Sequence, residues 1–198
     1  MIIIGLTGGI GSGKTKVLSF FKNKGILCYD SDKRAKILFN SNLKIKSKIK
    51  NYFGDEIYKL DKLDTKLLSS IVFNDSKKLE LLNSIIHPEV AKDFSNFINN
   101  TDASIVVKES AILFESNAYL VCDYNILITA PVDIRIKRVY KRDNSDFNMI
   151  KSKMSNQWSD EKKIEFADFS IENIDWEQTT SILEKLLINI KSQFNVTD

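Results

Sequence analysis

The chain has 198 residues and a formal net charge of +3, with 43% hydrophobic and 28% charged residues. This length and balance are typical of one globular domain, or of one core that holds a small insertion. The small basic excess does not predict nucleic-acid binding, and the apolar runs are too short to span a membrane. We therefore expect no nucleic-acid partner, no membrane contact and no obligate protein partner.

The chain contains only two cysteines and one histidine. Cys28 and Cys122 have neither a C-x-x-C partner nor a nearby histidine, so they do not predict a zinc site. The single histidine, His87, argues against a metal centre built from histidines. Two cysteines in a chain of this length are typical of a reduced protein, and we expect a cytoplasmic location.

The first thirty residues predict a β-loop-α-β unit. Residues 2–6 are a β-branched run closed by glycines, which is typical of a buried parallel strand. Residues 14–24 have apolar positions at helical spacing, and Gly25 suits the C-terminal cap of that helix. Residues 26–29 are a second short strand.

The middle of the chain, from residue 31 to about 100, has an almost entirely helical pattern. Apolar residues recur at helical spacing within residues 37–53, 67–72 and 79–86. Pro88 suits the first turn of a further helix, whose apolar face lies within residues 90–98. Because this block interrupts the alternation of strands and helices, we interpret residues 36–102 as an insertion that covers the site.

Strands return in the second half of the chain, at residues 104–107, 124–129 and 169–171. Pro131 opens a helix to about residue 140, and residues 141–163 are two polar helical pieces separated near Ser159. A final helix includes residues 182–190. Strands that alternate with helices predict an α/β fold with a parallel sheet, here of five strands.

Residues 8–15 read Gly-Gly-Ile-Gly-Ser-Gly-Lys-Thr and match the phosphate-loop pattern G-x-x-x-x-G-K-[ST]. The glycines allow successive backbone N–H groups to point at one phosphate, and the helix that begins near Lys14 adds its positive end. Lys14 supplies a cation to the β and γ phosphates, and the Thr15 hydroxyl is a ligand for Mg²⁺. The sequence therefore predicts a site for ATP and Mg²⁺. The loop residues that we expect to bind the nucleotide are Gly8, Gly9, Gly11, Ser12, Gly13, Lys14 and Thr15.

The class of phosphate-loop protein is narrowed by motifs that the chain lacks. A GTPase normally has an N-K-x-D guanine motif and a D-x-x-G switch, and neither occurs here. A motor ATPase would need a longer chain and a hydrophobic strand that ends in Asp-Glu. A small-molecule kinase remains, and a nucleotide-binding regulatory module is the alternative without catalysis.

A kinase needs a carboxylate near the acceptor hydroxyl, and three candidates follow predicted strands. Asp30 and Asp32 follow the second strand and would point the same way in an extended segment. Glu109 ends the third strand, at the sheet edge that faces the ligand in parallel sheets. Glu109 can contact either the water shell of the metal or the acceptor. Helix capping by Asp30 or Ser31, and a solvated edge charge at Glu109, are the structural alternatives.

Arginines and the single histidine complete the candidate site. Arg135, Arg138 and Arg142 follow the fourth strand, and the last two lie four residues apart on one helical face. Such arginines neutralise charge on a phosphoryl group in transfer, although a solvated basic face is the alternative. His87, before Pro88, is either a structural contact of the helix or a side chain of the acceptor site.

Taken together, these motifs resemble the dephospho-CoA kinase family along the whole chain. The loop alone occurs in thousands of proteins, whereas the ordered set is specific to this family. The matching segments are residues 4–15, Asp30-Ser31-Asp32, residues 81–88, Leu113-Phe114-Glu115, Arg138, Lys141-Arg142-Asp143-Asn144, Gln157, Ala167-Asp168-Phe169 and Asn173.

The resemblance implies a P-loop NTPase-type three-layer core over residues 1–35 and 103–198. It also implies a helical acceptor-binding insertion over residues 36–102 and a lid over residues 138–163. The lid segment is rich in charge and poor in apolar residues, so we expect little buried area to hold it shut. The activity implied is transfer of a phosphoryl group from ATP to the 3′-hydroxyl of dephospho-CoA, the last step of CoA synthesis. A kinase for another nucleoside or nucleotide is the alternative.

The resemblance also implies roles for individual residues. Asp32 is the candidate base, His87 lines the acceptor site, and Arg138 and Arg142 are the lid arginines. Lys16 stands where the family usually has a small or β-branched residue, and we count it with Asn173 among the nucleotide-binding residues. Glu109-Ser110-Ala111 replaces the commoner Asp-x-Pro, so the second carboxylate is one methylene longer.

Overall fold

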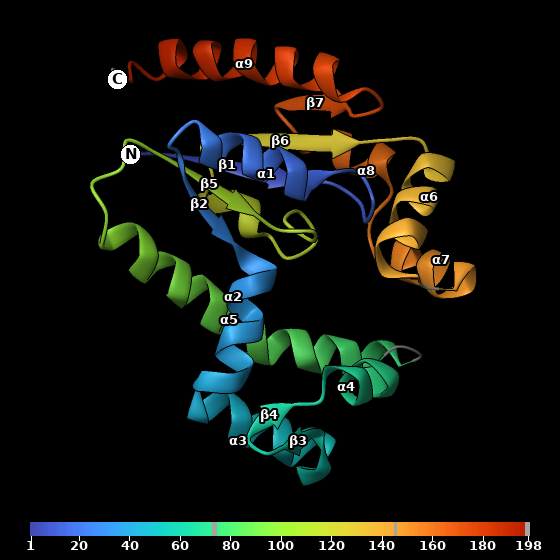
Figure 1. The fold of residues 1–198 in the computed structure, drawn as a ribbon. Coiled ribbons are helices and arrows are strands. Elements are labelled where there is room, and N and C mark those ends of the chain that lie inside the picture. The colour runs from blue at the N-terminus through green and yellow to red at the C-terminus, as the bar shows by residue number, and fades with distance from the viewer. Residues whose placement is uncertain (73–74, 145, 197–198) are drawn as a thin grey trace. The chain divides into compact units, whose positions relative to one another are not determined.

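The computed structural model describes residues 1–72, 75–144 and 146–196 (Figure 1). The chain divides into two compact units, which are residues 1–30 with 102–198 and residues 31–101. We call the first the core unit and the second the helical unit, and each is described by itself. Within the described ranges, no helix has both the length and the apolar character needed to cross a lipid bilayer.

The core unit is built on a five-stranded sheet in the order β2-β5-β1-β6-β7, and all of its pairings are parallel. Each strand lies at the place that the sequence predicts, so the predicted α/β fold with a five-stranded parallel sheet is confirmed. The strands are β1 (Ile2–Thr7), β2 (Leu27–Asp30), β5 (Ile105–Glu109), β6 (Tyr124–Thr129) and β7 (Phe169–Glu172).

The helices of the core unit begin and end at residues with clear local signals. Gly25 has φ 75° and follows the C-cap of the first helix, as predicted. Ser159 is the N-cap of α8 and accepts a hydrogen bond from Lys162 N, which confirms the predicted break there. The helices are α1 (Lys14–Asn23), α6 (Val132–Asp143), α7 (Phe147–Ser155), α8 (Asp160–Ile164) and α9 (Trp176–Gln193), with a short 3-10 turn η2 (Ala118–Val121).

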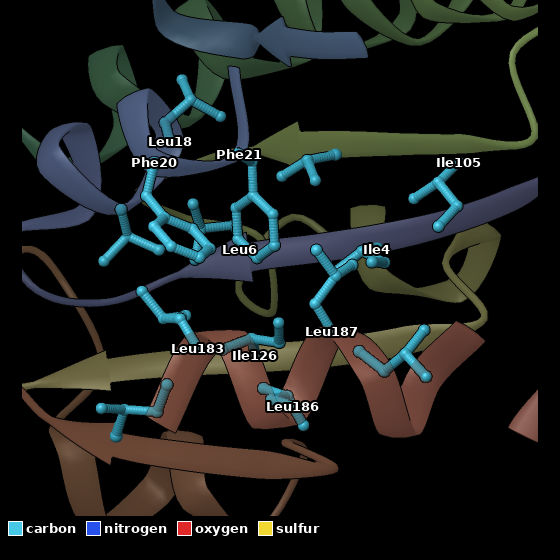
Figure 2. Close-up of a cluster of buried hydrophobic side chains, with 14 of the residues drawn as sticks. Ile4, Leu6, Leu18, Phe20, Phe21, Ile105, Ile126, Leu183, Leu186 and Leu187 are labelled. Atoms are coloured by element: carbon cyan, nitrogen blue, oxygen red, sulfur yellow. The ribbon is translucent and has the colours of Figure 1, made fainter. Parts of the chain in front are cut away.

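The apolar core lies where alternate residues of the strands meet α1 and α9 (Figure 2). Ile4 and Leu6 of β1 are completely buried there, beside Phe21 of α1 and Leu183 of α9. Each such side chain contributes about 1.5–3 kcal/mol when it is buried. The packing fixes the sheet, and therefore the edge from which the phosphate loop leaves β1.

The helical unit has a hydrophobic cluster of its own, formed within residues 45–86 by side chains such as Ile49, Leu68 and Ile86. A separate cluster of this kind is typical of a unit that folds around its own core. Its elements are α2 (Ser31–Ser41), α3 (Leu43–Phe53), η1 (Asp55–Ile57), β3 (Tyr58–Lys59), β4 (Lys62–Leu63), α4 (Thr65–Val72) and α5 (Ser76–Asn99).

The prediction of an almost entirely helical pattern was wrong at one hairpin. β3 and β4 pair antiparallel, and the turn residues Leu60 and Asp61 have φ of 48° and 63°. Positive φ at both central residues is the geometry of a tight hairpin turn, which usually shows Asn-Gly or Asp-Gly in the sequence. Leu60 and Asp61 lack that signature, and strands of two residues have no detectable period. Lys46 supports the turn, since its Nζ lies 2.6 Å from Asp61 Oδ2.

The prediction of a new helix at Pro88 was also wrong, because α5 runs unbroken through this residue. A proline inside a helix costs about 3 kcal/mol, since it removes one N–H donor and crowds the preceding turn. Ile85 and Ile86 before the proline and Phe94 after it are buried. Their burial, at about 1.5–3 kcal/mol for each side chain, offsets the cost of the proline.

Candidate phosphoryl-transfer site

The loop between β1 and α1 contains the predicted phosphate-binding residues. Gly11 and Gly13 have φ of 81° and 103°, a left-handed conformation that side chains rarely adopt. Gly13 is the N-cap of α1, and no described side chain caps this helix end. The N-terminus of a helix attracts anions because its N–H groups and its dipole point at the ligand. The positive end of α1 is therefore left for an anionic ligand.

Lys14 folds back over the loop, towards the edge of the sheet. Its Nζ donates to the carbonyl oxygen of Gly8 at 2.7 Å and lies 4.0 Å from Glu109 Oε1. Glu109 is the last residue of β5, only 6% exposed, and its partner on β2 is Asp30. The structure thus brings Lys14, Glu109 and Asp30 to the carboxyl edge of the parallel sheet, where such folds bind ligands.

The Asp30-Ser31-Asp32 motif is not extended, which corrects the sequence prediction. Asp30 ends β2, whereas α2 begins at Ser31 and has Asp32 in its first turn. The two carboxylates therefore do not share the side-chain direction that an extended segment would give them. Asp32 is exposed and belongs to the helical unit.

His87 lies inside α5, also in the helical unit, and is half-buried. Burial lowers its pKa from the usual 6.5, because the charged imidazolium loses solvation. The side chain is therefore neutral at physiological pH and can accept or donate a hydrogen bond. Its role in an acceptor site stays a prediction.

Arg135 of α6 fastens the phosphate loop. Its Nε donates to Ile10 O at 2.9 Å, and its Nη1 donates to Asp160 Oδ2 at 3.1 Å. A Cβ atom on Gly9 would lie 1.9 Å from Arg135 Nη2, and a Cβ on Gly11 would lie 2.5 Å from Arg135 O. These glycines therefore make room for α6 as well as for a phosphate. No local sequence signal indicated this role of Arg135.

Asp160 is the partly buried partner of Arg135. Its pKa is raised from the usual value mainly by desolvation, while Arg135 and then Lys163 act in the opposite direction. One of its carboxylate oxygens, Oδ1, is buried without a hydrogen-bond partner among the described residues. The Arg135–Asp160 pair is therefore a largely buried ion pair, and removal of either partner would leave the other charge without compensation.

Arg138 and Asn173 meet at the carbonyl oxygen of Ser12. Arg138 Nη1 donates to Ser12 O at 3.3 Å, and its Nη2 donates to Ile174 O at 3.3 Å. Asn173 Nδ2 donates to Ser12 O at 2.7 Å. Ser12 Oγ is buried without a hydrogen-bond partner in the part of the chain that the structure describes. The structure thus brings both predicted residues to the loop.

Arg142 is directed towards its neighbour Asp143. Nε lies 2.7 Å from Asp143 Oδ1, and Nη2 donates to Asp143 Oδ2 at 2.9 Å. This hydrogen bonding raises the pKa of Arg142 and lowers the pKa of Asp143. To reach a phosphate, the guanidinium must leave Asp143, so a role for Arg142 in phosphoryl transfer stays a prediction.

Thr15 and Lys16 are exposed in the first turn of α1. Lys16 Nζ lies 4.1 Å from the ring centroid of Trp176, which is a cation–π contact. The described residues contain no group of three or more His, Cys, Asp or Glu side chains that could hold a metal ion. A metal at this loop would therefore be held by few protein ligands, as is common for Mg²⁺ with substrate phosphates.

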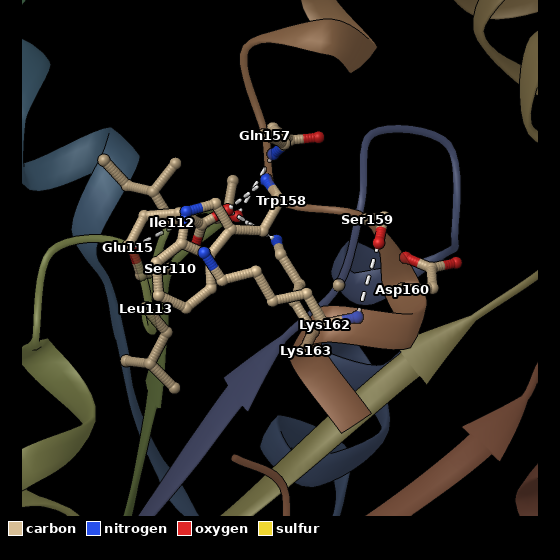
Figure 3. Close-up of polar contacts among 12 residues, drawn as sticks. Ser110, Ile112, Leu113, Glu115, Gln157, Trp158, Ser159, Asp160, Lys162 and Lys163 are labelled. Carbon is tan, nitrogen blue, oxygen red and sulfur yellow. Dashed lines mark hydrogen bonds and ion pairs between the residues drawn. The ribbon is translucent and has the colours of Figure 1, made fainter. Parts of the chain in front are cut away.

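Buried polar contacts hold the last part of the predicted lid to the rest of the core unit (Figure 3). Lys163 is fully buried; its Nζ lies 3.0 Å from Glu115 Oε1 and donates to Ala111 O at 3.1 Å. Trp158 N donates to Glu115 Oε1 at 3.0 Å, and the Trp158 ring packs on Phe166 with centroids 5.4 Å apart. The sequence did not predict these contacts, because the segment has few apolar residues.

Comparison with known proteins links most of the chain to one family. The family model for dephospho-CoA kinase matches residues 2–178. A dephospho-CoA kinase of Porphyromonas gingivalis is 38% identical, over 79% of this chain and 78% of that protein. A dephospho-CoA kinase of Chlorobium chlorochromatii is 32% identical over 94% of both chains.

Solved structures show the same fold. A crystal structure of a Thermus thermophilus protein superposes with a TM-score of 0.84 at 27% identity, over 100% of this chain and 98% of that one. Dephospho-CoA kinase of Campylobacter jejuni gives a TM-score of 0.68 at 24% identity, over 98% of both chains. Shikimate kinase of Acinetobacter baumannii gives 0.55 at 16% identity, over 96% and 94%, and shares the fold alone.

Proposed function

The chain belongs to the dephospho-CoA kinase family, and from this premise we propose that it transfers the γ-phosphoryl group of ATP to the 3′-hydroxyl of dephospho-CoA. The products are CoA and ADP, and the reaction is the last step of CoA biosynthesis. The observation that supports this most strongly is the family match over residues 2–178, because it includes the helical unit as well as the phosphate loop. A match to the loop alone would fit many other kinases.

The phosphate loop binds the nucleotide in this proposal. The loop amides and the positive end of α1 face the phosphates, and Lys14 exchanges its contact with Gly8 O for a phosphate oxygen. Arg138 and Asn173 hold Ser12 O, which fixes the direction of the neighbouring peptide groups. Catalysis is then mostly positioning and charge stabilisation, as in other phosphoryl transfers.

Mg²⁺ is the metal that fits the residues at this loop. When bound, it neutralises charge on the phosphates and orients them. The Thr15 hydroxyl would hold it directly, and the buried carboxylate of Glu109 would hold its water shell from the end of β5. The position of Glu109 beside Lys14 supports this assignment, although Glu109 can contact the acceptor instead.

The helical unit binds the acceptor in this proposal, through Asp32 and His87. Asp32 removes the proton of the acceptor hydroxyl as it attacks, which is general-base catalysis. Asp30 is the alternative base, because it lies at the end of β2 and pairs there with Glu109 of β5.

Lid closure completes the proposed site. The moving part is the end of α6 with α7, since buried contacts hold residues 157–163 to the rest of the core unit. Closure would detach Arg142 from Asp143 and bring it to the phosphates, and it would exclude water from the group in transfer.

We place the enzyme in the cytoplasm, where CoA is made and thiols stay reduced. Cys28 and Cys122 are free cysteines. Burial raises the pKa of Cys28 to about 11 and the pKa of Cys122 to about 12. Both are therefore protonated thiols at neutral pH and are poor nucleophiles, which supports a structural role for each.

A coupled ADP-release assay across acceptors tests the proposed function. We expect the highest kcat/KM with dephospho-CoA, and values lower by orders of magnitude with adenosine, AMP and shikimate. Equal or better kcat/KM with adenosine or AMP would overturn the assignment of the acceptor. ADP release that is independent of every acceptor would instead favour a regulatory ATP-binding module.

A further inference from the structure

Ile10 lies at the tip of the phosphate loop, and its backbone is held from both sides. Its N–H donates to Gln157 Oε1 at 2.8 Å, and its carbonyl oxygen accepts from Arg135 Nε at 2.9 Å. The residues on either side of Ile10 are glycines, and Gly11 is in a left-handed conformation. Glycine gives a loop large conformational freedom, so these two contacts restrict the tip beyond the hydrogen bond that Ser12 N donates to Gly9 O at 3.1 Å.

Gln157 holds a second group through the other end of its amide. Its Nε2 donates to Ala111 O at 3.1 Å, and the same carbonyl oxygen accepts from Lys163 Nζ at 3.1 Å. Lys163 also pairs with Glu115, two residues beyond Leu113 in the same turn (Figure 3). One side chain therefore connects the tip of the phosphate loop to the turn that follows β5, the strand that ends at Glu109.

We propose that Gln157 is a positioning residue for nucleotide binding, a role that rests on the proposed use of ATP. Its amide sets the tip of the phosphate loop against the turn at residues 110–115. The loop amides are then arranged for phosphate before the nucleotide arrives. Preorganisation of this kind raises affinity, because the ordering cost is met during folding and not during binding.

The contacts of Gln157 distinguish a role in nucleotide binding from general stabilisation of the fold. Gln157 is only half-buried, whereas Lys163 and Arg135 nearby are buried and charged. Loss of the Gln157 amide leaves Arg135 on Ile10 O and Lys163 on Ala111 O, so the loop and the turn keep their charged anchors. The expected effect is therefore on nucleotide affinity more than on stability.

The variant Gln157→Met tests the proposal, because methionine has a similar length and cannot make either hydrogen bond. Affinity for ADP and for a non-hydrolysable ATP analogue is measured by calorimetric titration without acceptor, and kcat and both KM values are measured separately. We expect about tenfold weaker nucleotide binding, because the loop tip loses the contact that arranges its amides before the nucleotide arrives. The KM for dephospho-CoA should change by less than about twofold, which corresponds to a change in binding free energy below about 0.4 kcal/mol.

Gln193→Met is the matched control, because Gln193 is exposed at the end of α9. It should bind nucleotide as the unmodified chain does. Amide exchange at Ile10, followed by NMR, gives a direct readout of the contact. We expect faster exchange of the Ile10 amide in Gln157→Met and unchanged exchange in Gln193→Met.

A second variant separates the two ends of the amide. Gln157→Glu keeps an oxygen that can accept from Ile10 N but places a second oxygen against Ala111 O, so we expect an intermediate loss of affinity. Wild-type nucleotide affinity and Ile10 exchange in Gln157→Met would overturn the proposal. If Gln157→Met does not fold, wild-type affinity in Gln157→Glu would overturn it. Failure of the unmodified chain to phosphorylate dephospho-CoA would refute the proposed acceptor and leave these titrations interpretable.

Discussion

The phosphate loop and the helical unit obtain their order in different ways. The loop is fastened by side chains that lie far away in the sequence, because Arg135, Gln157 and Asn173 contact residues that precede them by 125, 147 and 161 positions. The helical unit closes instead on an apolar cluster formed by nearby residues. Single polar substitutions should therefore disturb the loop, whereas the helical unit should keep its fold when surface residues change and its core stays intact.

The largest effect is expected for Lys14→Ala in the loop. A cation on the phosphoryl group in transfer contributes about 10³- to 10⁵-fold to kcat in related reactions, and we expect a loss within that range. The fold should persist but with a lower melting temperature, because the buried carboxylate of Glu109 loses the cation 4.0 Å away. Lys22→Ala, at the exposed end of the same helix, is the control and should keep its activity. Near-normal turnover in Lys14→Ala would contradict the proposed role of the loop in phosphate binding.

Asp32→Asn tests the helical unit in the same assay. Asparagine keeps the size of the side chain but cannot take the acceptor proton, so kcat should fall by about 10²- to 10⁴-fold with little change in KM. The fold should persist, because Asp32 is exposed at the start of α2. Asp30→Asn is the matched comparison. A loss below tenfold in Asp32→Asn, with a larger loss in Asp30→Asn, would move the base to Asp30.

Lys163→Met tests the buried contacts that hold residues 157–163. It leaves the carboxylate of Glu115 buried without its cation, and breaking a buried pair in this way costs about 3–5 kcal/mol. Urea unfolding measures the loss. Lys162→Met is the neighbouring control, since Lys162 is exposed and gives up only a cation–π contact with Trp158, worth about 0.5–1 kcal/mol. Glu115→Gln added to Lys163→Met should recover part of the stability, and equal losses in the two single variants would contradict the account.

The smallest effect is a pH dependence of stability that comes from His87, the only histidine of the chain. Its pKa is lowered by burial in the folded state, so the unfolded chain binds more protons between the lowered pKa and the usual 6.5. Its contribution to stability is therefore complete above pH 6.5 and is lost as the pH falls towards the lowered pKa. In denaturant unfolding, His87→Gln should show a flatter profile over this window. An identical pH profile of stability in both proteins would show that another group causes the effect.

Patterns within short segments predicted much of the fold. The five strands, the phosphate loop and the break at Ser159 each depend on neighbouring residues, and each is present in the structure. The hairpin at Leu60-Asp61 and the continuous helix through Pro88 were missed. Both run against local preference and are stabilised by contacts outside the segment, the ion pair of Lys46 with Asp61 and the burial on both sides of Pro88.

The candidate site was predictable only in part, for the same reason. Lys14, Asn173 and Arg138 were named from the motif and the family pattern, and the structure brings all three to the loop. The contact of Arg135 with Ile10 could not be predicted, because the sequence of a helix does not show whether an arginine is exposed to solvent or buried. The ion pair of Lys163 and Glu115 could not be predicted for the same reason.

The most direct test of the account is to identify the product of the reaction. The purified chain is incubated with ATP, Mg²⁺ and dephospho-CoA, and the acceptor is analysed by mass spectrometry and phosphorus NMR. The account predicts one added phosphoryl group on the 3′-hydroxyl, formed in equal amount to ADP and absent with Lys14→Ala. Formation of ADP with unmodified dephospho-CoA, or a phosphoryl group at another position, would contradict it.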